Sequence, residues 1–279
     1  MRSKLAEVFL AAALAGQMIG CAGAPRPAPP DLALDDALKR LAFRAPQILN
    51  ARGRLGVRAP DGDSNLAFRL AYDERLGMRI DFTWKALIGL VRRDGVLLVR
   101  GDSAWGWASR EEDGRGVEDF PLLEGPLSRD FAPADFVELL IGTVGDLERR
   151  RAEIASYERL ERGSAYRLAL RRPGRVESFV FDSASGRLLQ RSLTDGTSGR
   201  RVVAVYERHG SGGGAPTRPG AIDLRDSFGP VRMRFVISEQ DTTRREDRRA
   251  FDVPPGARRI HPVSPDQDRI VLPGELSHP

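Results

Sequence analysis

The sequence predicts a mainly β fold with a few helices (α+β), built as one strongly curved antiparallel sheet of about eleven strands with helices covering its concave face. Three observations lead to this prediction. Apolar and polar residues alternate with a period of two over most of the chain, turn-like segments separate the alternating stretches, and only two segments have helical spacing. No repeat of fixed period is visible.

Residues 1–20 have the layout of a secretory signal. Arg2 and Lys4 give a basic start, Val8–Ala15 is apolar, and Gly20 is a small residue next to a cleavage point. The apolar run is shorter than the ~20 residues that a transmembrane helix needs. We therefore interpret this segment as a leader peptide.

Cys21 is the only cysteine, and "MIGC" (Met18–Cys21) resembles the lipobox of bacterial lipoproteins. The resemblance implies an acylated Cys21 as the new N-terminus, and several acyl chains anchor a protein stably in a membrane. The alternative is an ordinary signal peptide with an incidental cysteine. Ala22 follows, and the sorting rule of enterobacterial lipoproteins would then imply the periplasmic face of the bacterial outer membrane.

The remaining chain divides into three parts. Residues 21–31 hold the cysteine and an Ala- and Pro-rich tether, residues 32–257 form the domain, and residues 258–279 form a tail with one short strand at 269–272. With Cys21 acylated, no disulfide is available, and a domain of this size can do without one.

Two helices are expected, within Asp31–Phe43 and Ala132–Asp146. Pro133 can occupy the first turn of the second helix, and Gly142 or Gly145 can end it. The apolar residues that share a helix face are Leu34, Ala37, Leu38 and Leu41 in the first and Phe136, Leu139 and Leu140 in the second.

The strands are expected where the period is two. They cover residues 52–58, 66–72, 76–82, 95–102, 104–109, 165–171, 175–181, 187–194, 201–208, 221–225 and 231–240. The glycine-rich segment "HGSGGGAPTRPG" (His209–Gly220) is interpreted as a flexible hairpin tip, because it lacks the short βα turn that phosphate binding would need.

The formal charge of +5 does not indicate nucleic-acid binding. It arises from 44 basic residues interleaved with 39 acidic ones, which is typical of mixed, solvated strand faces. Attraction to anionic lipid headgroups is the more plausible consequence of the excess. Hydrophobic residues make up 41% of the chain, enough for a folded core.

Catalytic and metal-binding patterns are not found, so we expect no enzyme, no cofactor and no metal. Ser103 in "GDSAW" lacks a G-x-S-x-G elbow. Asp135 and Glu138, one helical turn apart, are interpreted as solvated acids, and the sequence shows no buried polar cluster. The only histidines, none with metal-ligand spacing, are His209, His261 and His278, all expected in loops or the tail.

The order of the segments resembles the LolA/LolB-like family of bacterial lipoprotein carriers and related outer-membrane lipoproteins. The segments are an N-terminal helix, "GRLGVR", "LAFRLAY", "LGMRIDF", "VRRDGVLLVRGD" with Asp94 and Gly95 at a hairpin turn, "PADFVELLIG", "YRLAL", "VVAVYER" and "FDVPPGA" (Phe251–Ala257). The resemblance implies a half-open β-barrel whose apolar interior holds acyl chains of a lipid or lipoprotein. A lipid anchor of its own makes the chain more similar to LolB than to the soluble shuttle LolA.

The inward residues of the strands would line either a cavity or a packed core. Trp105 and Trp107, on one side of a strand, could line the cavity or cap the core at the barrel mouth. The candidate lining residues are Phe68, Leu70, Met78, Ile80, Phe82, Trp105, Trp107, Phe179, Met233 and Phe235.

"TWKALIGLV" (Thr83–Val91) breaks the alternation with a nearly continuous apolar run. In LolB a loop at a comparable place reaches the membrane through an exposed leucine. By resemblance, Leu87 or Ile88 would do so here, beside Trp84 and Lys85, which suit the bilayer interface. The alternative is a strand that runs into the core.

Two functions remain open. The first is a membrane-anchored protein that binds lipid or lipoprotein acyl chains for transfer or insertion at the outer membrane, with a periplasmic carrier or envelope protein as a possible partner and no nucleic acid. The second is a non-catalytic structural or assembly accessory with a filled core, since one fold hosts several roles.

Overall fold

The structure is a computed structural model. It describes residues 32–41, 46–59, 62–85, 92–108, 131–144, 147, 149–160, 164–209, 218–227, 229 and 232–261. All of these residues belong to one compact unit, which begins at Leu32. Within the described ranges, no helix has both the length and the apolar character to cross a membrane.

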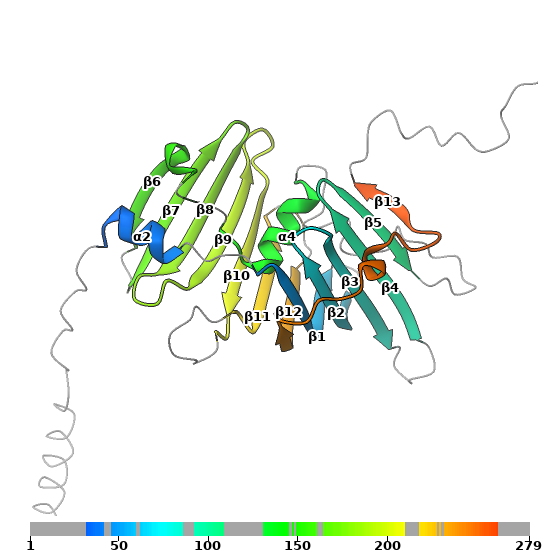
Figure 1. The fold of residues 1–279 in the computed structure, drawn as a ribbon. Helices are drawn as coiled ribbons and strands as arrows, with labels where there is room; N and C mark the ends of the chain where they lie inside the picture. The colour runs from blue at the N-terminus through cyan, green and yellow to red at the C-terminus, as the bar shows by residue number, and fades with distance from the viewer. Residues whose placement is uncertain are drawn as a thin grey trace, which may run out of the picture. The chain divides into compact units, whose positions relative to one another are not determined.

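A single antiparallel sheet of thirteen strands forms the fold, with the order β13-β5-β4-β3-β2-β1-β12-β11-β10-β9-β8-β7-β6 (Figure 1). The strands are β1 Ile48–Ala59, β2 Gly62–Asp73, β3 Gly77–Lys85, β4 Arg92–Arg100, β5 Ser103–Ala108, β6 Ile154–Arg159, β7 Ala165–Arg172, β8 Arg175–Asp182, β9 Leu188–Asp195, β10 Arg201–Glu207, β11 Ala221–Asp226, β12 Arg232–Asp241 and β13 Arg258–His261. The predicted fold class, a strongly curved open sheet, is therefore confirmed.

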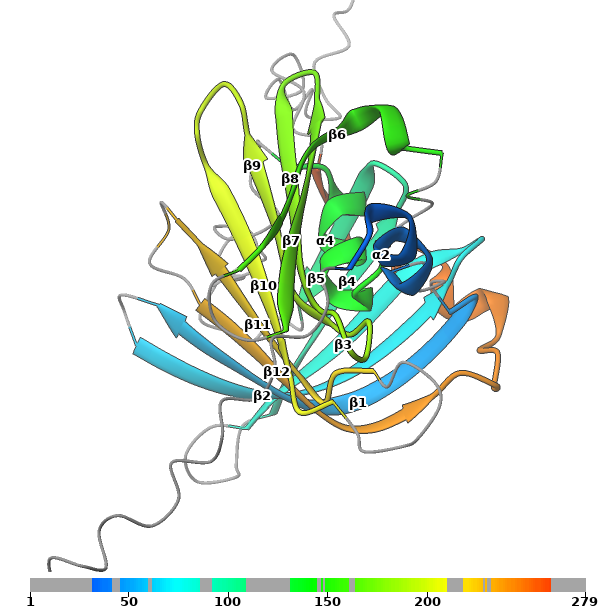
Figure 2. The same cartoon turned by 90° about the vertical axis from the view of Figure 1, so that its left-hand side faces the viewer.

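The chain builds the sheet as two meanders, β1–β5 and β6–β12, which are joined by pairing of β1 with β12. Since β5 and β6 lie at opposite sides of the sheet, the chain between them has to cross one face. It does so with helix α4 (Pro133–Ile141), which lies on the concave side together with helix α2 (Leu34–Leu41), as predicted (Figure 2).

Helix α4 begins and ends where its sequence indicates, and α2 lies within the segment predicted for it. The Asp135 carboxylate accepts a hydrogen bond from the amide of Ala132 (2.9 Å), and Pro133 occupies the first turn of α4. Gly142 ends α4 in the left-handed conformation (φ +70°), and its amide donates to the carbonyl oxygen of Glu138 (3.0 Å). The apolar face of α2 buries Ala37, Leu38 and Leu41. Two short 3-10 helices, η3 Arg151–Glu153 and η4 Arg248–Phe251, complete the elements.

The strand count of about eleven was too low by two. The strand β6 was missed because "IASYER" lies at the sheet edge, where only one neighbour constrains its pattern. The strand β13, within the residues assigned to the tail, was missed because it has four residues. It pairs with β5 and includes His261, which therefore lies in a strand.

The hairpin turn expected at Asp94 and Gly95 was wrong. Both residues lie inside β4, where Asp94 pairs with Thr83 and Gly95 pairs with Phe82. The Thr83 hydroxyl donates to the Asp94 carboxylate (2.8 Å). This cross-strand bond satisfies the aspartate in a strand, although the Asp-Gly dipeptide alone favours a turn.

After β12, the segment Thr242–Ala257, which we call the C-terminal strap, crosses the convex face of β2–β5 to reach β13. Arg245 pairs with Asp73 (3.0 Å), and Arg79 donates to the carbonyl oxygen of Ala250 (2.7 Å). The ring of Phe251 is buried in a small apolar cluster on that face. The strap therefore packs on the convex face of β2–β5.

Gly53, at a bulge in β1, is required for the pairing that joins the two meanders. A Cβ atom there would lie 2.0 Å from the carbonyl oxygen of Val236 in β12, and backbone cannot withdraw without opening the pair. At Gly56, in the same strand, a Cβ would meet only the Asn65 side chain at 3.6 Å.

We predict that Gly53→Ala lowers the free energy of unfolding by about 3 kcal/mol, at the upper end of overpacking effects. The matched control Gly56→Ala should change it by less than about 1 kcal/mol. Urea unfolding of the chain from Ala22 onward measures both. Equal effects of the two substitutions would contradict the role of the bulge.

Candidate functional site

Eight of the ten candidate lining residues lie buried on the concave face. They belong to one continuous apolar core that also includes the buried faces of α2 and α4. Its packing includes an edge-on contact of Phe68 with Phe235, whose ring centroids are 5.3 Å apart. The eight residues are Phe68, Leu70, Met78, Ile80, Phe82, Phe179, Met233 and Phe235.

Trp105 and Trp107 lie on the other side of the sheet. Trp105 packs against the cluster of Ala71, Leu98 and Phe251 beneath the C-terminal strap. Trp107, two residues further along β5, faces the same side, and a Cβ at Gly256 of the strap would contact its indole at 4.0 Å. The two indoles therefore pack against the C-terminal strap on the convex face.

The candidate membrane-contact residues are only partly described. Trp84 and Lys85 end β3, and their side chains lie outside the described residues. Leu87, Ile88 and the acylation candidate Cys21 also lie outside them.

A buried arginine on β9 holds α4 against the concave face. The side chain of Arg191 is almost fully buried and donates to the carbonyl oxygen of Thr143 (2.7 Å), just beyond the helix. It also donates to the carboxylates of Glu138 on α4 and Glu177 on β8. Its guanidinium carbon lies 5.4 Å from the ring centroid of Phe179.

Arg191 belongs to a chain of ion pairs that runs from the surface into the core and out again. Glu177 also accepts from Arg150, which in turn pairs with Glu153 (3.0 Å), and Glu153 pairs with Arg172 (2.8 Å). Positive and negative groups alternate along this chain, so each buried charge has at least one opposite neighbour. Its members are Glu138, Arg191, Glu177, Arg150, Glu153 and Arg172.

The buried pair shifts the pKa of both partners toward the charged forms. Burial alone would raise the pKa of Glu177, but attraction by Arg191 and hydrogen bonding from Arg150 hold it below its ordinary value. Burial alone would lower the pKa of Arg191, but Glu177 and Glu138 raise it. Burial raises the pKa of the nearby Tyr206, whose hydroxyl donates to the carbonyl oxygen of Leu139 (2.9 Å).

The interpretation of Asp135 and Glu138 as solvated acids was wrong. Asp135 is buried and pairs with Arg175 (2.6 Å), whose guanidinium lies 5.9 Å from the ring centroid of Phe131. Glu138 is half exposed but holds Arg191. The expectation of no buried polar cluster was also wrong. A signal existed, since Glu177 alternates in phase with Phe179 and Phe181 and so had to face the core.

Helix α2 is held differently, mainly at its ends. Tyr157 donates to the carbonyl oxygen of Leu32 (2.8 Å), and the amide of Leu32 donates to the hydroxyl of Tyr166 (2.9 Å). At the other end, Arg40 donates to the carbonyl oxygen of Ser183. The only described ion pair of the helix joins Asp35 to Arg151 at the surface (2.6 Å), and no charged group of α2 is buried in the described part of the chain.

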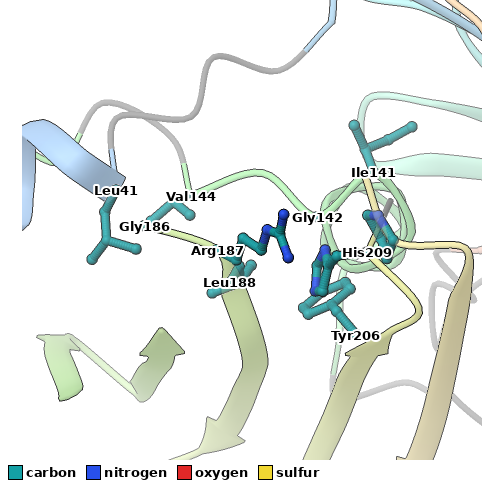
Figure 3. Close-up of a pocket in the computed structure, with 10 residues that line it drawn as sticks. Leu41, Ile141, Gly142, Val144, Gly186, Arg187, Leu188, Tyr206 and His209 are labelled. Carbon is teal, nitrogen blue, oxygen red and sulfur yellow. The ribbon is translucent and has the colours of Figure 1, made fainter. Parts of the chain in front are cut away.

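A small pocket lies where the C-terminal ends of α2 and α4 meet the sheet (Figure 3). The open space within it is about 20 Å³, room for about one water molecule. An acyl chain does not fit into this space unless the covering elements move. The lining residues are Leu41, Ile141, Gly142, Val144, Gly186, Arg187, Leu188, Tyr206, His209 and Pro219.

The site can bury apolar groups, and its charges are arranged as structural ion pairs. Each carboxylate of the buried network pairs with an arginine. The arginine keeps the carboxylate ionised, and an ionised carboxylate only accepts hydrogen bonds. Within the described residues, no group of three or more His, Cys, Asp or Glu side chains is placed to hold a metal ion. The geometry therefore suits non-covalent binding of an apolar group.

Compared with models of protein families and with curated proteins, the sequence matches none. Its fold is shared with solved structures. A LolA superfamily protein, NE2245 from Nitrosomonas europaea, has a TM-score of 0.51 at 14% identity, covering 80% of this chain and 99% of that one. A DUF1329 family protein from Desulfovibrio piger has a TM-score of 0.51 at 10% identity, covering 78% and 95%.

A putative outer membrane lipoprotein-sorting protein domain from Vibrio parahaemolyticus also matches, with a TM-score of 0.48 at 11% identity over 78% of this chain and 94% of that one. At these identities, the two structures with TM-scores of 0.51 show the fold alone. The chain has a LolA/LolB-like fold, as predicted from the order of its segments.

We predict that Arg191 and Glu177 are strongly coupled. Arg191→Met should lower the free energy of unfolding by about 3–5 kcal/mol, because it leaves Glu177 buried with one partner fewer. The double variant Arg191→Met/Glu177→Leu should be at least about 2 kcal/mol more stable than the sum of the single effects. The exposed pair Arg167–Glu158 (3.0 Å) is the control and should couple by less than about 1 kcal/mol in the same urea experiment. Additive effects at the buried pair would contradict the assignment.

The lowered pKa of Glu177 predicts a specific pH dependence. Its folded-state pKa lies below the ordinary value of 4.5, so its contribution to stability is present above that pH and is lost as the pH falls through the folded value. Glu177→Gln should therefore be less stable than the wild type near neutral pH, and the difference should shrink below about pH 4.5. Urea unfolding from neutral pH to about pH 3 measures this. A difference that stays constant over that range would contradict the prediction.

Proposed function

We propose that this protein binds a lipid or acyl chain on its concave face beneath α2 and acts in lipoprotein or lipid transfer at the bacterial outer membrane. The observation that supports this most directly is a continuous apolar face covered by a short helix without a buried charge. The LolA/LolB-like fold agrees with the proposal.

The two helices differ in the kind of contact that holds them. Displacing α4 would separate Arg191 from Glu138 and leave a buried charge with fewer partners. Displacing α2 exposes chiefly the apolar side chains of Ala37, Leu38 and Leu41. We therefore assign α2 as the cover that moves and α4 as a fixed part of the site.

An acyl chain can replace the apolar contacts that α2 gives up. Each buried methylene contributes about 0.8 kcal/mol, so a few methylenes balance the loss of one leucine contact. Binding of this kind is non-covalent and needs no cofactor. Transfer then follows the difference in affinity between donor and acceptor sites.

The cellular setting of the proposal rests on the N-terminal sequence. The "MIGC" segment supports acylation of Cys21, and Ala22 supports sorting to the outer membrane by resemblance. A protein anchored in this way meets lipid or lipoprotein acyl chains, and a periplasmic carrier or another envelope protein is the proposed partner.

A second function is favoured by a different observation. Eight of the lining candidates are packed in the core, and the pocket between the helices has room for about one water molecule. A non-catalytic accessory of the cell envelope, with the same anchor and a permanently filled core, has the same appearance. The two functions differ in whether α2 opens.

A reversible lock on α2 separates them. A Cβ atom at Gly186 would lie 3.3 Å from the Cβ of Arg40 on α2, close to the ~3.8 Å of a disulfide, and 2.9 Å from the Arg40 carbonyl oxygen, so the backbone has to shift slightly to accept a cysteine there. The chain from Ala22 onward lacks Cys21 and so carries no other cysteine. We predict that Arg40→Cys/Gly186→Cys takes up phospholipid or a fatty acid at least about 10-fold less when oxidised, since the lock holds α2 on the apolar face. Native mass spectrometry after incubation with lipid measures the uptake.

The reduced form of the same variant is the matched control, because both forms carry whatever strain the two cysteines introduce. It also lacks the hydrogen bond from Arg40 to Ser183 that holds one end of α2, so it should take up lipid at least as well as the wild type. Equal uptake by the oxidised and reduced forms would show that α2 is not the entry route. A wild-type protein that takes up no lipid would contradict acyl binding and leave the accessory function.

A further inference from the structure

Six arginines gather at one end of the convex face, away from the C-terminal strap. In the pairing of the strands, Arg58 of β1 lies opposite Arg232 of β12, and Arg232 lies opposite Arg225 of β11. The others stand at neighbouring positions on the same face. We call this set the arginine patch, and it consists of Arg54, Arg58, Arg201, Arg225, Arg232 and Arg234.

Three members of the patch share a single carboxylate. Asp223 on β11 is 1% exposed and accepts hydrogen bonds from Arg232 (2.8 Å) and Arg225 (3.2 Å), while Arg234 lies at 3.5 Å. Burial alone would raise the pKa of Asp223, but these hydrogen bonds hold it below its ordinary value. One negative charge thus fixes the positions of three guanidinium groups and neutralises the charge of one.

The remaining acids of this region do not balance the excess. Glu207 pairs with Arg234 (2.6 Å), and Asp63 lies 3.4 Å from Arg58. In the described part of the chain, Arg54 and Arg201 have no acidic partner. Among the described residues, the patch has six arginines and three carboxylates, a surplus of about three positive charges, and the neighbouring pair Arg200–Asp226 adds no net charge.

The chemistry of the patch fits phosphate groups. Guanidinium groups present planar pairs of N–H donors that match phosphate oxygens, and they are weakly hydrated. Between them the sheet carries the small or partly exposed residues Gly56, Val203 and Val205, so that a headgroup can approach the backbone. No aromatic side chain stands in the described part of this patch, whereas aromatic anchors dominate protein–protein hot spots.

A second feature places a membrane-prone sequence at the same end of the sheet. Leu66 of β2 pairs with Leu55 on one side and with Trp84 on the other, so Trp84 lies level with the arginine-bearing end of β1. Lys85 follows it at the end of β3. An aromatic residue beside a lysine suits the headgroup region of a bilayer.

We propose that the arginine patch is a docking surface for the anionic phosphate headgroups of a membrane. It holds the folded unit on the lipid surface through the end of the sheet where β1, β3 and β11 finish. This contact is separate from the acyl-binding site, because Arg201 begins β10 whereas the pocket residue Tyr206 stands near the end of that strand. Docking therefore leaves the pocket between α2 and α4 away from the membrane.

The test is binding of the chain from Ala22 onward to vesicles, so that acylation of Cys21 contributes nothing. The wild type should bind vesicles of phosphatidylglycerol mixed with phosphatidylcholine, and added salt should weaken this binding. The triple variant Arg54→Gln/Arg58→Gln/Arg225→Gln should bind them about 100-fold more weakly, since each of the three arginines near an anionic surface contributes about a factor of five. It keeps Arg232 and Arg234 on Asp223, so the fold should be retained, and thermal unfolding checks this.

The matched control removes the same charge elsewhere. Arg167 and Arg171 on β7 and Arg248 on the C-terminal strap are exposed, and their triple change to Gln should weaken vesicle binding less than about 3-fold. Equal losses in the two triple variants would overturn the proposal in favour of a diffuse charge effect. Failure of the wild type to bind anionic vesicles would also overturn the proposal. An acidic protein partner would then be the alternative occupant of the patch. Either result is independent of lipid uptake by the locked and unlocked α2 variant.

Discussion

The attachment of α4 through Arg191 is the interaction on which the arrangement of this protein depends. A connection between opposite sides of an open sheet has to cross one face, and here it crosses the apolar one. Apolar packing alone is non-directional and allows a helix to slide or rotate. Arg191 fixes the helix because its donors meet Glu138, Glu177 and the carbonyl oxygen of Thr143 together. These contacts offset the desolvation cost of burying the charges of Arg191 and Glu177. They also specify one position of the helix.

Much of the fold follows from local sequence patterns. The alternation of apolar residues predicts most strands, and the cap residues Pro133 and Gly142 predict where α4 begins and ends. The edge strands β6 and β13 were not predictable in this way. Their conformation depends on partners, such as the pairing of Arg259 with Trp105, that are distant in sequence. The Asp94–Gly95 turn failed for the same reason, because the partner that decides its conformation is Thr83 on another strand.

The candidate site was predictable in its apolar part and not in its charged part. Inward positions such as Phe82 and Phe235 follow from period two. The phase of β8 places Glu177 inward, but neither Glu177 nor Arg191 shows in its own strand the partner that makes burial of its charge possible. Only the side-by-side placement of β8 and β9 shows that they neutralise each other. The assignment of Trp105 to the concave face was wrong. The sequence does not give the register between β4 and β5, which decides the face that Trp105 occupies. On the convex face, the C-terminal strap covers the indole, so an inward position is not needed for its burial.

The arginines of this chain have two different roles. Which role an arginine has depends on the number of arginines relative to carboxylates around it. In the core, Arg191 pairs with the two carboxylates of Glu138 and Glu177, so its positive charge is neutralised within the structure and holds α4. On the convex face, Asp223 is surrounded by three arginines, so positive charge remains for an external anion. An excess of carboxylate around a buried arginine stabilises a fold, whereas an excess of arginine around a buried carboxylate creates an exposed surface that attracts anions. The two proposals fit together on this basis, because the proposed acyl site opens at α2 while the proposed membrane contact holds the opposite end of the sheet in place.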